Sequence, residues 1–186
     1  MASELDVDVG ILLYGDSRLR RPARPVTPGE DLGDLPERLC AAMLEAEGIG
    51  LAASQLGDER RVIAVRDPAE QGSRPLVLVN PAIMTHRGPM VSFEEGCLSF
   101  PGVFLTLIRP RGVEVAYLDL AGRPQTLRNE GILARVIQHE VDHLDGRLFV
   151  DHLPRWRRWS LSARLGHIRR RGKDARRVSR ERREQA

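Results

Sequence analysis

The stretch VIQHEVDHLDG, residues 136–146, places two histidines four positions apart around a glutamate. From about residue 129 to residue 145 the apolar residues recur at helical spacing, and Gly146 is well placed to end the helix. Residues i and i+4 lie on one face of a helix, so His139 and His143 can present nitrogens to the same ion. The stretch therefore predicts a metal-binding helix, on which Glu140 can reach a water molecule at the metal and act as general base.

A catalytic divalent metal site usually has three protein ligands and one open position, so a third ligand is needed. In the pattern HExxHxxGxxH the third histidine would stand at the position of Phe149. The only glutamates after Asp151 are Glu181 and Glu184, both in an arginine-rich segment. The remaining candidate is Cys97 in EEGCLSFPG, because a thiolate with two imidazoles is a known ligand set for zinc or iron. A buried structural thiol is the alternative for this cysteine.

The composition is that of a soluble globular domain, with 186 residues, 41% hydrophobic and 30% charged. No apolar run approaches the roughly 20 residues that cross a bilayer. The opening MASELDVDVG is acidic, whereas a signal or transit peptide would be basic. Two cysteines are too few for a secreted disulfide framework. We therefore expect no membrane partner and a cytoplasmic location.

The positive charge is concentrated at the C-terminal end. Residues 155–186 hold thirteen Lys or Arg and three acidic residues, a balance of +10, which leaves residues 1–154 at −7 within a net charge of +3. We expect a basic helix over about 154–171, with Trp156, Trp159 and Leu165 at helical spacing, and a disordered tail over 172–186 because that segment has almost no apolar residues. Residues 1–171 are then a single catalytic domain.

The rest of the chain predicts an α+β fold. Residues 33–48, GDLPERLCAAMLEAEG, have the cap and the apolar spacing of an amphipathic helix. Short β-branched or alternating runs bounded by Pro, Gly and Asp predict antiparallel strands within residues 60–67, 75–83, 112–120 and 125–129. We expect antiparallel β-sheets packed around the metal-binding helix, with an N-terminal helix and a basic C-terminal helix on the outside.

Three blocks of this sequence together resemble the peptide deformylases: GIGLAASQ at 48–55, EGCLS at 95–99 and QHEVDH at 138–143. The likeness extends more weakly over about residues 11–165. It implies removal of the formyl group from the N-terminal formyl-methionine of newly synthesised proteins, with metal-bound hydroxide attacking the formyl carbon. It also implies Fe²⁺ as the cellular metal, for which Zn²⁺, Ni²⁺ or Co²⁺ can substitute.

The resemblance implies specific roles near the metal. The Gln55 side-chain amide and the Leu98 backbone N–H would stabilise the negatively charged oxygen of the intermediate. Glu140 would take a proton from water and pass it to the leaving amine. Gly48 and Gly50 would allow an extended peptide to pair with their loop, and Ile49 would line a pocket for the methionine side chain. A plain helix C-cap is the alternative for Gly48.

Three further polar residues, Glu95, Arg109 and Asp142, are interpreted as partners that orient the histidines or brace the cysteine loop. For Asp142 a solvated helix face is the alternative. The basic C-terminal helix can contact ribosomal RNA while the enzyme acts on nascent chains, and a merely solvated helix is the alternative. Two other functions remain open: a general metallopeptidase using the same HExxH, and an inactive basic module bound to RNA.

Overall fold

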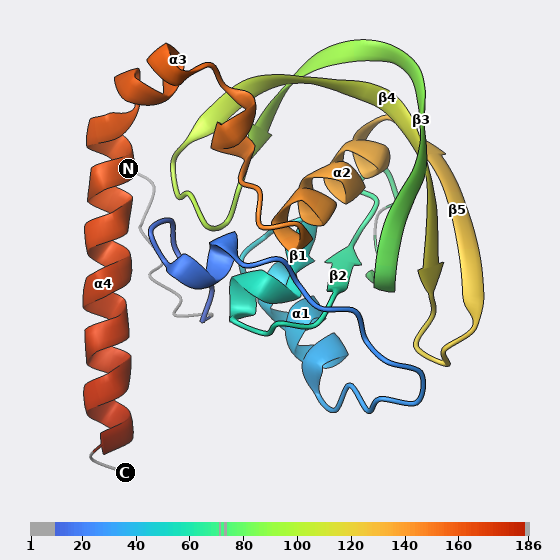
Figure 1. Ribbon diagram of the computed structural model, residues 1–186, viewed down its shortest axis with the longest axis horizontal. Helices are drawn as coiled ribbons and strands as arrows, with labels where there is room; N and C mark the ends of the chain where they lie inside the picture. Colours follow the sequence, from blue (N-terminus) through green and yellow to red (C-terminus); the bar gives the residue numbers. More distant parts are fainter. Residues whose placement is uncertain (1–9, 71, 73, 185–186) are drawn as a thin grey trace.

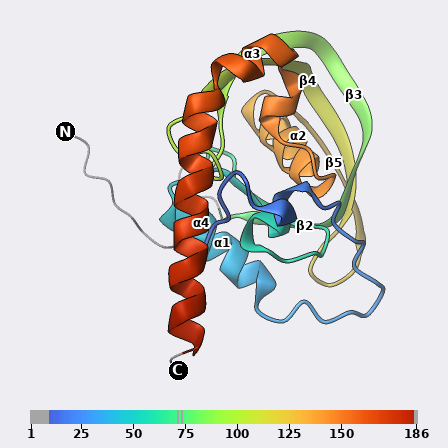
Figure 2. The ribbon, with the colours of Figure 1, turned by 60° about the vertical axis from the view of Figure 1, so that its left-hand side comes forward.

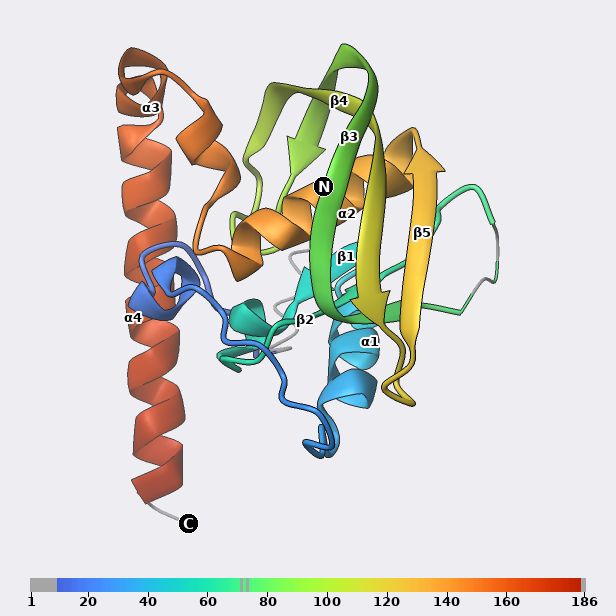
Figure 3. The same cartoon turned by 45° about the vertical axis from the view of Figure 1, so that its right-hand side comes forward.

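The computed structural model describes residues 10–70, 72 and 74–184, and only the backbone of 175–184. Its centre is helix α2 (Ile132–Leu144), around which one antiparallel sheet curves in the order β1-β2-β3-β4-β5 (Figures 1 and 3). The strands are β1 (Gly50–Ala52), β2 (Val62–Val65), β3 (Leu76–Gly96), β4 (Phe104–Leu118) and β5 (Pro124–Glu130). The predicted α+β architecture is confirmed, with one continuous sheet where several were expected.

Strand β2 is buried on both faces, which explains why its sequence VIAV contains no polar residue. Successive side chains of a strand point to opposite faces. Ile63 and Val65 belong to the apolar cluster that packs on α2, whereas Val62 and Ala64 belong to the cluster that packs on α1 (Leu35–Glu45). The sheet is therefore covered by the metal-bearing helix on one face and by the predicted N-terminal helix on the other.

Helix α2 is buried nearly all round. Its apolar residues Leu133, Ile137 and Leu144 are at most 9% exposed and pack against sheet residues that include Leu78 and Val115. Burying a Leu or Ile side chain stabilises a fold by about 1.5–3 kcal/mol. The polar side chains of α2 are thus placed inside the protein by the apolar residues beside them.

Strand β3 is much longer than the run predicted within residues 75–83. Its first part pairs with β2, and its later part pairs with β4 up to the Gly96–Phe104 pair, with irregular register between Arg87 and Met90. Most residues from Met84 to Glu94 are exposed, so no alternation marks them as a strand. This extension carries the chain to Glu95 and Cys97, beside α2.

The C-terminal segment differs from its prediction in three respects. The expected helix over 154–171 is divided into α3 (Arg155–Ser160) and α4 (Ser162–Glu184). Helix α4 continues through 172–184, where disorder was predicted, because Arg, Glu and Ala sustain a helical backbone without apolar residues. Trp156 and Trp159 are 70% and 79% exposed and do not pack. The last two residues of the predicted tail, 185 and 186, lie outside the described residues.

Helix α4 runs along the outside of the molecule and attaches through its first half (Figures 1 and 2). Leu165 and Ile168 are buried in a cluster with Phe100, Leu148 and residues of the short helices η1 (Ser17–Arg20) and η3 (Phe149–His152). Among the described helices, none combines the length and the apolar character of a membrane-spanning segment.

Candidate metal centre

The curved sheet brings three potential metal ligands together. His139 and His143 come from α2, and Cys97 follows directly after β3. Their ligand atoms lie within 4.8 Å of one another, and Cys97 Sγ is 3.2 Å from His143 Nε2. Both histidines are buried, and Cys97 is partly buried. The residues predicted from HExxH and from EGCLS thus converge on one point.

The chemistry of these groups fits a divalent metal ion. His139 Nδ1 lies 3.0 Å from Glu95 Oε2, which leaves Nε2 of the same ring to bind a metal. One thiolate and two imidazoles form a three-ligand set that suits zinc or iron and leaves a position open. The Glu140 Oε2 atom is buried beside them with no hydrogen-bond partner among the described residues. A buried acceptor of this kind is costly unless a bound group satisfies it.

The two histidines and Glu140 have strongly shifted pKa values. Burial raises the pKa of Glu140 to about 7. Burial also lowers the pKa of His143 well below its ordinary value, and the positive charge of His139 adds to this effect. For His139, burial lowers the pKa, but interactions with Cys97 and Glu95 outweigh burial and raise it. A carboxyl group that titrates near neutral pH is suited to exchange protons during a reaction.

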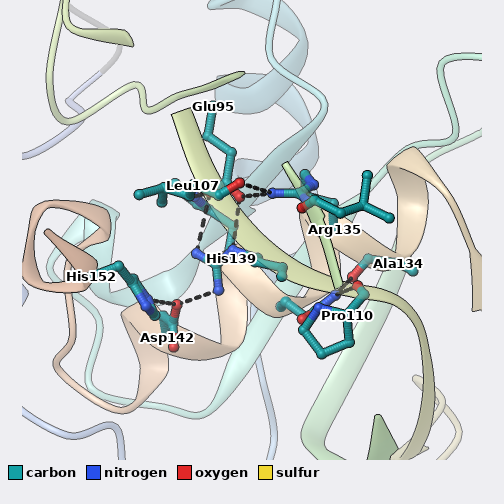
Figure 4. A network of polar contacts seen from close by, with 11 residues as sticks. Glu95, Leu107, Pro110, Ala134, Arg135, His139, Asp142 and His152 are labelled. Atoms are coloured by element: carbon teal, nitrogen blue, oxygen red, sulfur yellow. Dashed lines mark hydrogen bonds and ion pairs between the residues drawn. The ribbon is translucent and has the colours of Figure 1, made fainter. Parts of the chain in front are cut away.

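A buried network of charges supports His139 (Figure 4). Arg109 donates to both carboxylate oxygens of Glu95, at 2.7 and 3.2 Å, and to Asp142 Oδ2 at 2.7 Å. Burial raises the pKa of Glu95, but hydrogen bonds from His139 and Arg109 outweigh it and lower the pKa to about 2. Glu95 is therefore held as a carboxylate against the ring of His139, and Asp142 is not simply on a solvated helix face.

Two members of the network are not predicted by the sequence. Arg135 donates to Glu95 Oε1 at 2.7 Å, and His152 Nε2 lies 2.8 Å from Asp142 Oδ2. Arg135 stands four residues before His139 in an otherwise apolar turn, and that isolated charge is the signal that could have identified it. His152 carries no such signal, because nothing in its local sequence distinguishes it from other exposed histidines.

A cavity of about 520 Å³ opens next to the ligands. Gln55, on the short helix η2 (Ala53–Leu56), is 1% exposed and contributes to the wall. Its Oε1 accepts a hydrogen bond from the Ala52 N–H at 2.8 Å, while its Nε2 donates to Ser99 Oγ at 3.1 Å and lies 3.8 Å from Cys97 Sγ. The lining also includes Gly48, Ile49, Gly50, Phe93, Glu95, Cys97, Leu98, Ile132, Arg135, Val136, His139 and Glu140.

Two glycines at the cavity are required by close packing. A Cβ atom on Gly50 would lie 2.6 Å from Glu140 Oε1 and 2.6 Å from Val136 Cγ1. A Cβ atom on Gly48 would lie 2.9 Å from Leu98 Cδ1. A larger residue at Gly50 would displace the Glu140 carboxylate and the Val136 side chain, and one at Gly48 would displace the end of the Leu98 side chain. The spacing GIG therefore lets the β1 edge approach the metal ligands.

The chain matches known proteins over most of its length. The family model described as polypeptide deformylase matches residues 9–159. A peptide deformylase of Synechococcus sp. (strain RCC307) is 44% identical over 141 residues, which are 75% of this chain and 70% of that protein. A peptide deformylase of Alkalilimnicola ehrlichii is 43% identical over 165 residues, 88% of this chain and 92% of that protein.

Solved structures agree with the sequence matches. The peptide deformylase of Thermus thermophilus has 40% identity and a TM-score of 0.78, with 88% of this chain and 98% of that chain covered. The peptide deformylase of Synechococcus elongatus, in complex with actinonin, has 41% identity and a TM-score of 0.74, with 85% of this chain and 84% of that chain covered. With Cys97, His139 and His143 as its metal site, the chain belongs to the peptide deformylase family of metal-dependent hydrolases.

Proposed function

We propose that Glu140 is the general base and acid of the deformylase reaction on N-terminal formyl-methionine. The observation that carries this role is its buried Oε2 atom, which has no hydrogen-bond partner in the described part of the chain, on a residue that lines the cavity with His139. A divalent ion held by the three ligands supplies Lewis-acid chemistry, lowering the pKa of water toward about 7. Glu140 takes the proton released from water and delivers it to the amine that leaves.

Gln55 and the Leu98 backbone N–H are proposed to stabilise the negative charge that develops on the formyl oxygen. The Ala52 N–H holds Gln55 Oε1, so the amide nitrogen is turned toward Cys97 and the cavity. Leu98 follows Cys97 directly and lines the same cavity. Donors fixed in place before the reaction are effective because they do not need to reorganise.

The substrate is proposed to lie along the β1 edge. Among the described residues, strand β1 is the edge strand of the sheet and pairs with β2, and Gly48 and Gly50 at its start line the cavity. An extended chain can add to such an edge as a further strand. Ile49, Leu98 and Val136 then offer apolar surface to the methionine side chain.

The cellular metal is proposed to be Fe²⁺, with Zn²⁺, Ni²⁺ and Co²⁺ able to replace it. The mixed thiolate and imidazole ligands accept all of these ions, and selection among them depends on supply as well as affinity. A reducing compartment, for which we propose the cytoplasm, would keep Cys97 available as a thiolate.

The C-terminal helices are proposed to bring the enzyme to nascent chains by contacting RNA at the ribosome surface. Trp156 and Trp159, three residues apart on α3, are 70% and 79% exposed, and the Arg157 guanidinium lies 6.0 Å from the Trp156 ring centre. Aromatic rings beside arginines are typical of surfaces that stack unpaired bases. Cosedimentation with ribosomes is expected to weaken in a Trp156→Ala/Trp159→Ala variant, and unchanged binding would contradict the contact.

Formate release from formyl-Met-Ala-Ser tests the catalytic assignment. The protein is purified anaerobically and loaded with iron or nickel, beside Glu140→Ala and an exposed-carboxylate control, Glu130→Ala on β5. We expect Glu140→Ala to keep its metal and lose release, Gln55→Ala to lose about 100- to 1000-fold in kcat, and the control to match wild type. Release by metal-loaded Glu140→Ala at the wild-type rate would rule out the proposed base.

A further inference from the structure

Arg135 links the three structural elements that form the metal site. It lies on α2, four residues before His139, and is only 7% exposed. One terminal nitrogen, Nη1, donates to Glu95 Oε1 at 2.7 Å and to the Leu107 carbonyl at 3.4 Å, and the other, Nη2, donates to the Val91 carbonyl at 2.6 Å (Figure 4). Its acceptors therefore include the backbones of both β3 and β4.

The position of these acceptors has a consequence for the metal ligands. Cys97 belongs to the β3–β4 arm, defined here as residues 90–96 of β3, residues 104–110 of β4 and the loop between them. His139 and His143 belong to α2. We propose that Arg135 is a positioning residue, which fixes this arm against α2 and so sets the distance between the thiol and the two imidazoles.

The charge balance explains why a cation is needed at this position. Glu95 is buried, the Asp142 side chain is 14% exposed, and Arg109 bonds both of these acids. Without Arg135, Glu95 would lose one of its two arginine partners, and a buried carboxylate with less compensating charge is unfavourable. With it, Glu95 has four donors, from two arginines and His139, which match the capacity of a carboxylate.

The shape of the Arg135 side chain explains why a lysine at this position would hold the same acceptors less well. The planar guanidinium reaches a carboxylate and two strand carbonyls at once, whereas a lysine ammonium is a single point of charge. Its Cζ also lies 5.6 Å from the centre of the Phe93 ring, and both residues line the cavity. The Arg135 stem on α2 and the Phe93 ring on the arm thus form adjoining parts of the cavity wall.

Metal retention tests this proposal without any substrate. Wild type, Arg135→Met, Arg135→Lys and the control Arg128→Met are loaded with Co²⁺ and mixed with excess chelator. Arg128 is a suitable control because it is an ion-paired arginine on β5 with a side chain 67% exposed. We expect Arg135→Met to lose Co²⁺ about 10- to 100-fold faster than wild type and to show shifted Co²⁺ absorption bands. Arg135→Lys should lose Co²⁺ more slowly than Arg135→Met but faster than wild type. Arg128→Met should match wild type.

Wild-type rates and bands in Arg135→Met would overturn the proposal and leave Arg135 a purely structural residue. If Arg135→Met does not fold, as judged by circular dichroism, Arg135→Lys decides, because it keeps the buried charge. Wild-type metal retention in the lysine variant would then overturn the proposal as well. The measurement does not depend on the role proposed for Glu140, so failure of that role in the formate assay would leave this result unaffected.

Discussion

Arginine serves two different purposes in two regions of this protein. Around Glu95, Arg109 and Arg135 are 6% and 7% exposed, and each bonds fixed acceptors. On α3 and the first half of α4 most arginines are exposed, and the helices attach to the body through apolar residues such as Leu165. The first region uses arginine as a directional donor, and the second uses it as charge on a surface.

Burial decides what an arginine contributes to the protein. A buried ion pair is costly to form, and its value lies in holding groups in one geometry, while removal of one partner is strongly destabilising. An exposed pair contributes little to folding and is screened by salt. Mutations in the network should therefore affect stability and metal geometry, and mutations of the exposed arginines on α3 and α4 should affect only interactions with partners.

The largest expected effect is that of Glu95→Ala. The substitution leaves Arg135 and Arg109 short of a buried anion and leaves His139 Nδ1 without its acceptor. We expect the free energy of unfolding to fall by about 3–5 kcal/mol, measured by urea unfolding of metal-free protein. The control is Glu114→Ala, which removes the partner of the exposed arginines Arg87 on β3 and Arg128 on β5. Equal losses in the two variants would contradict the distinction between buried and exposed arginines.

A smaller loss of stability is expected when the packing that attaches the C-terminal helices is weakened. Leu165 is 7% exposed and packs in the cluster with Phe100 and Leu148, so Leu165→Ala would leave a cavity. We expect a loss of about 2–3 kcal/mol in the free energy of unfolding. Trp159→Ala, at a position 79% exposed, should leave that free energy within about 0.5 kcal/mol. A destabilised Trp159→Ala would show that α3 has a packing role.

The sequence predicted the metal helix well and the sheet incompletely. The period of residues 129–145 matches α2 because that helix is buried by its own apolar residues. The later part of β3 was not predicted, because backbone pairing with β4 holds it and its side chains are mostly exposed. The helical 172–184 segment was not predicted either, since apolar content indicates packing and not backbone conformation.

Prediction of the metal site from the sequence was incomplete in the same way. The ligands were predicted because ligand chemistry restricts the residue types and HExxH fixes the spacing of two of them. Arg135 and Glu95 are forty residues apart in sequence, and their contact depends on where the long β3 turns back over α2. Periodicity predicts which face of a helix or strand a residue occupies. It does not predict how far that face lies from the face of another element.

The Asp58–Arg60 ion pair is intermediate in exposure, so its removal should have an intermediate effect on stability. Asp58 and Arg60 pair at 2.7 Å with both side chains 18% exposed. Burial raises the pKa of Asp58, but hydrogen bonds with Arg60 outweigh it and lower the pKa below the ordinary 3.8. The pair therefore contributes stability above about pH 4, which is lost as the pH falls through the lowered pKa. Asp58→Asn should cost less than about 1 kcal/mol at pH 7 and nothing once the pH is below that pKa, and a loss independent of pH would contradict this.

The smallest effect on folding is expected for Arg155→Ser/Arg157→Ser on α3. Both arginines are exposed, and neither has an ion pair with an acid among the described residues, so the free energy of unfolding should change by less than about 0.5 kcal/mol. If they contact unpaired RNA, each neutralises a phosphate, and the slope of log affinity against log salt should shrink by about 0.7 per arginine. Binding to single-stranded RNA at several salt concentrations measures that slope. An unchanged slope with unchanged stability would leave these two arginines without a part in RNA binding and would confine any such contact to the remaining basic residues of α4.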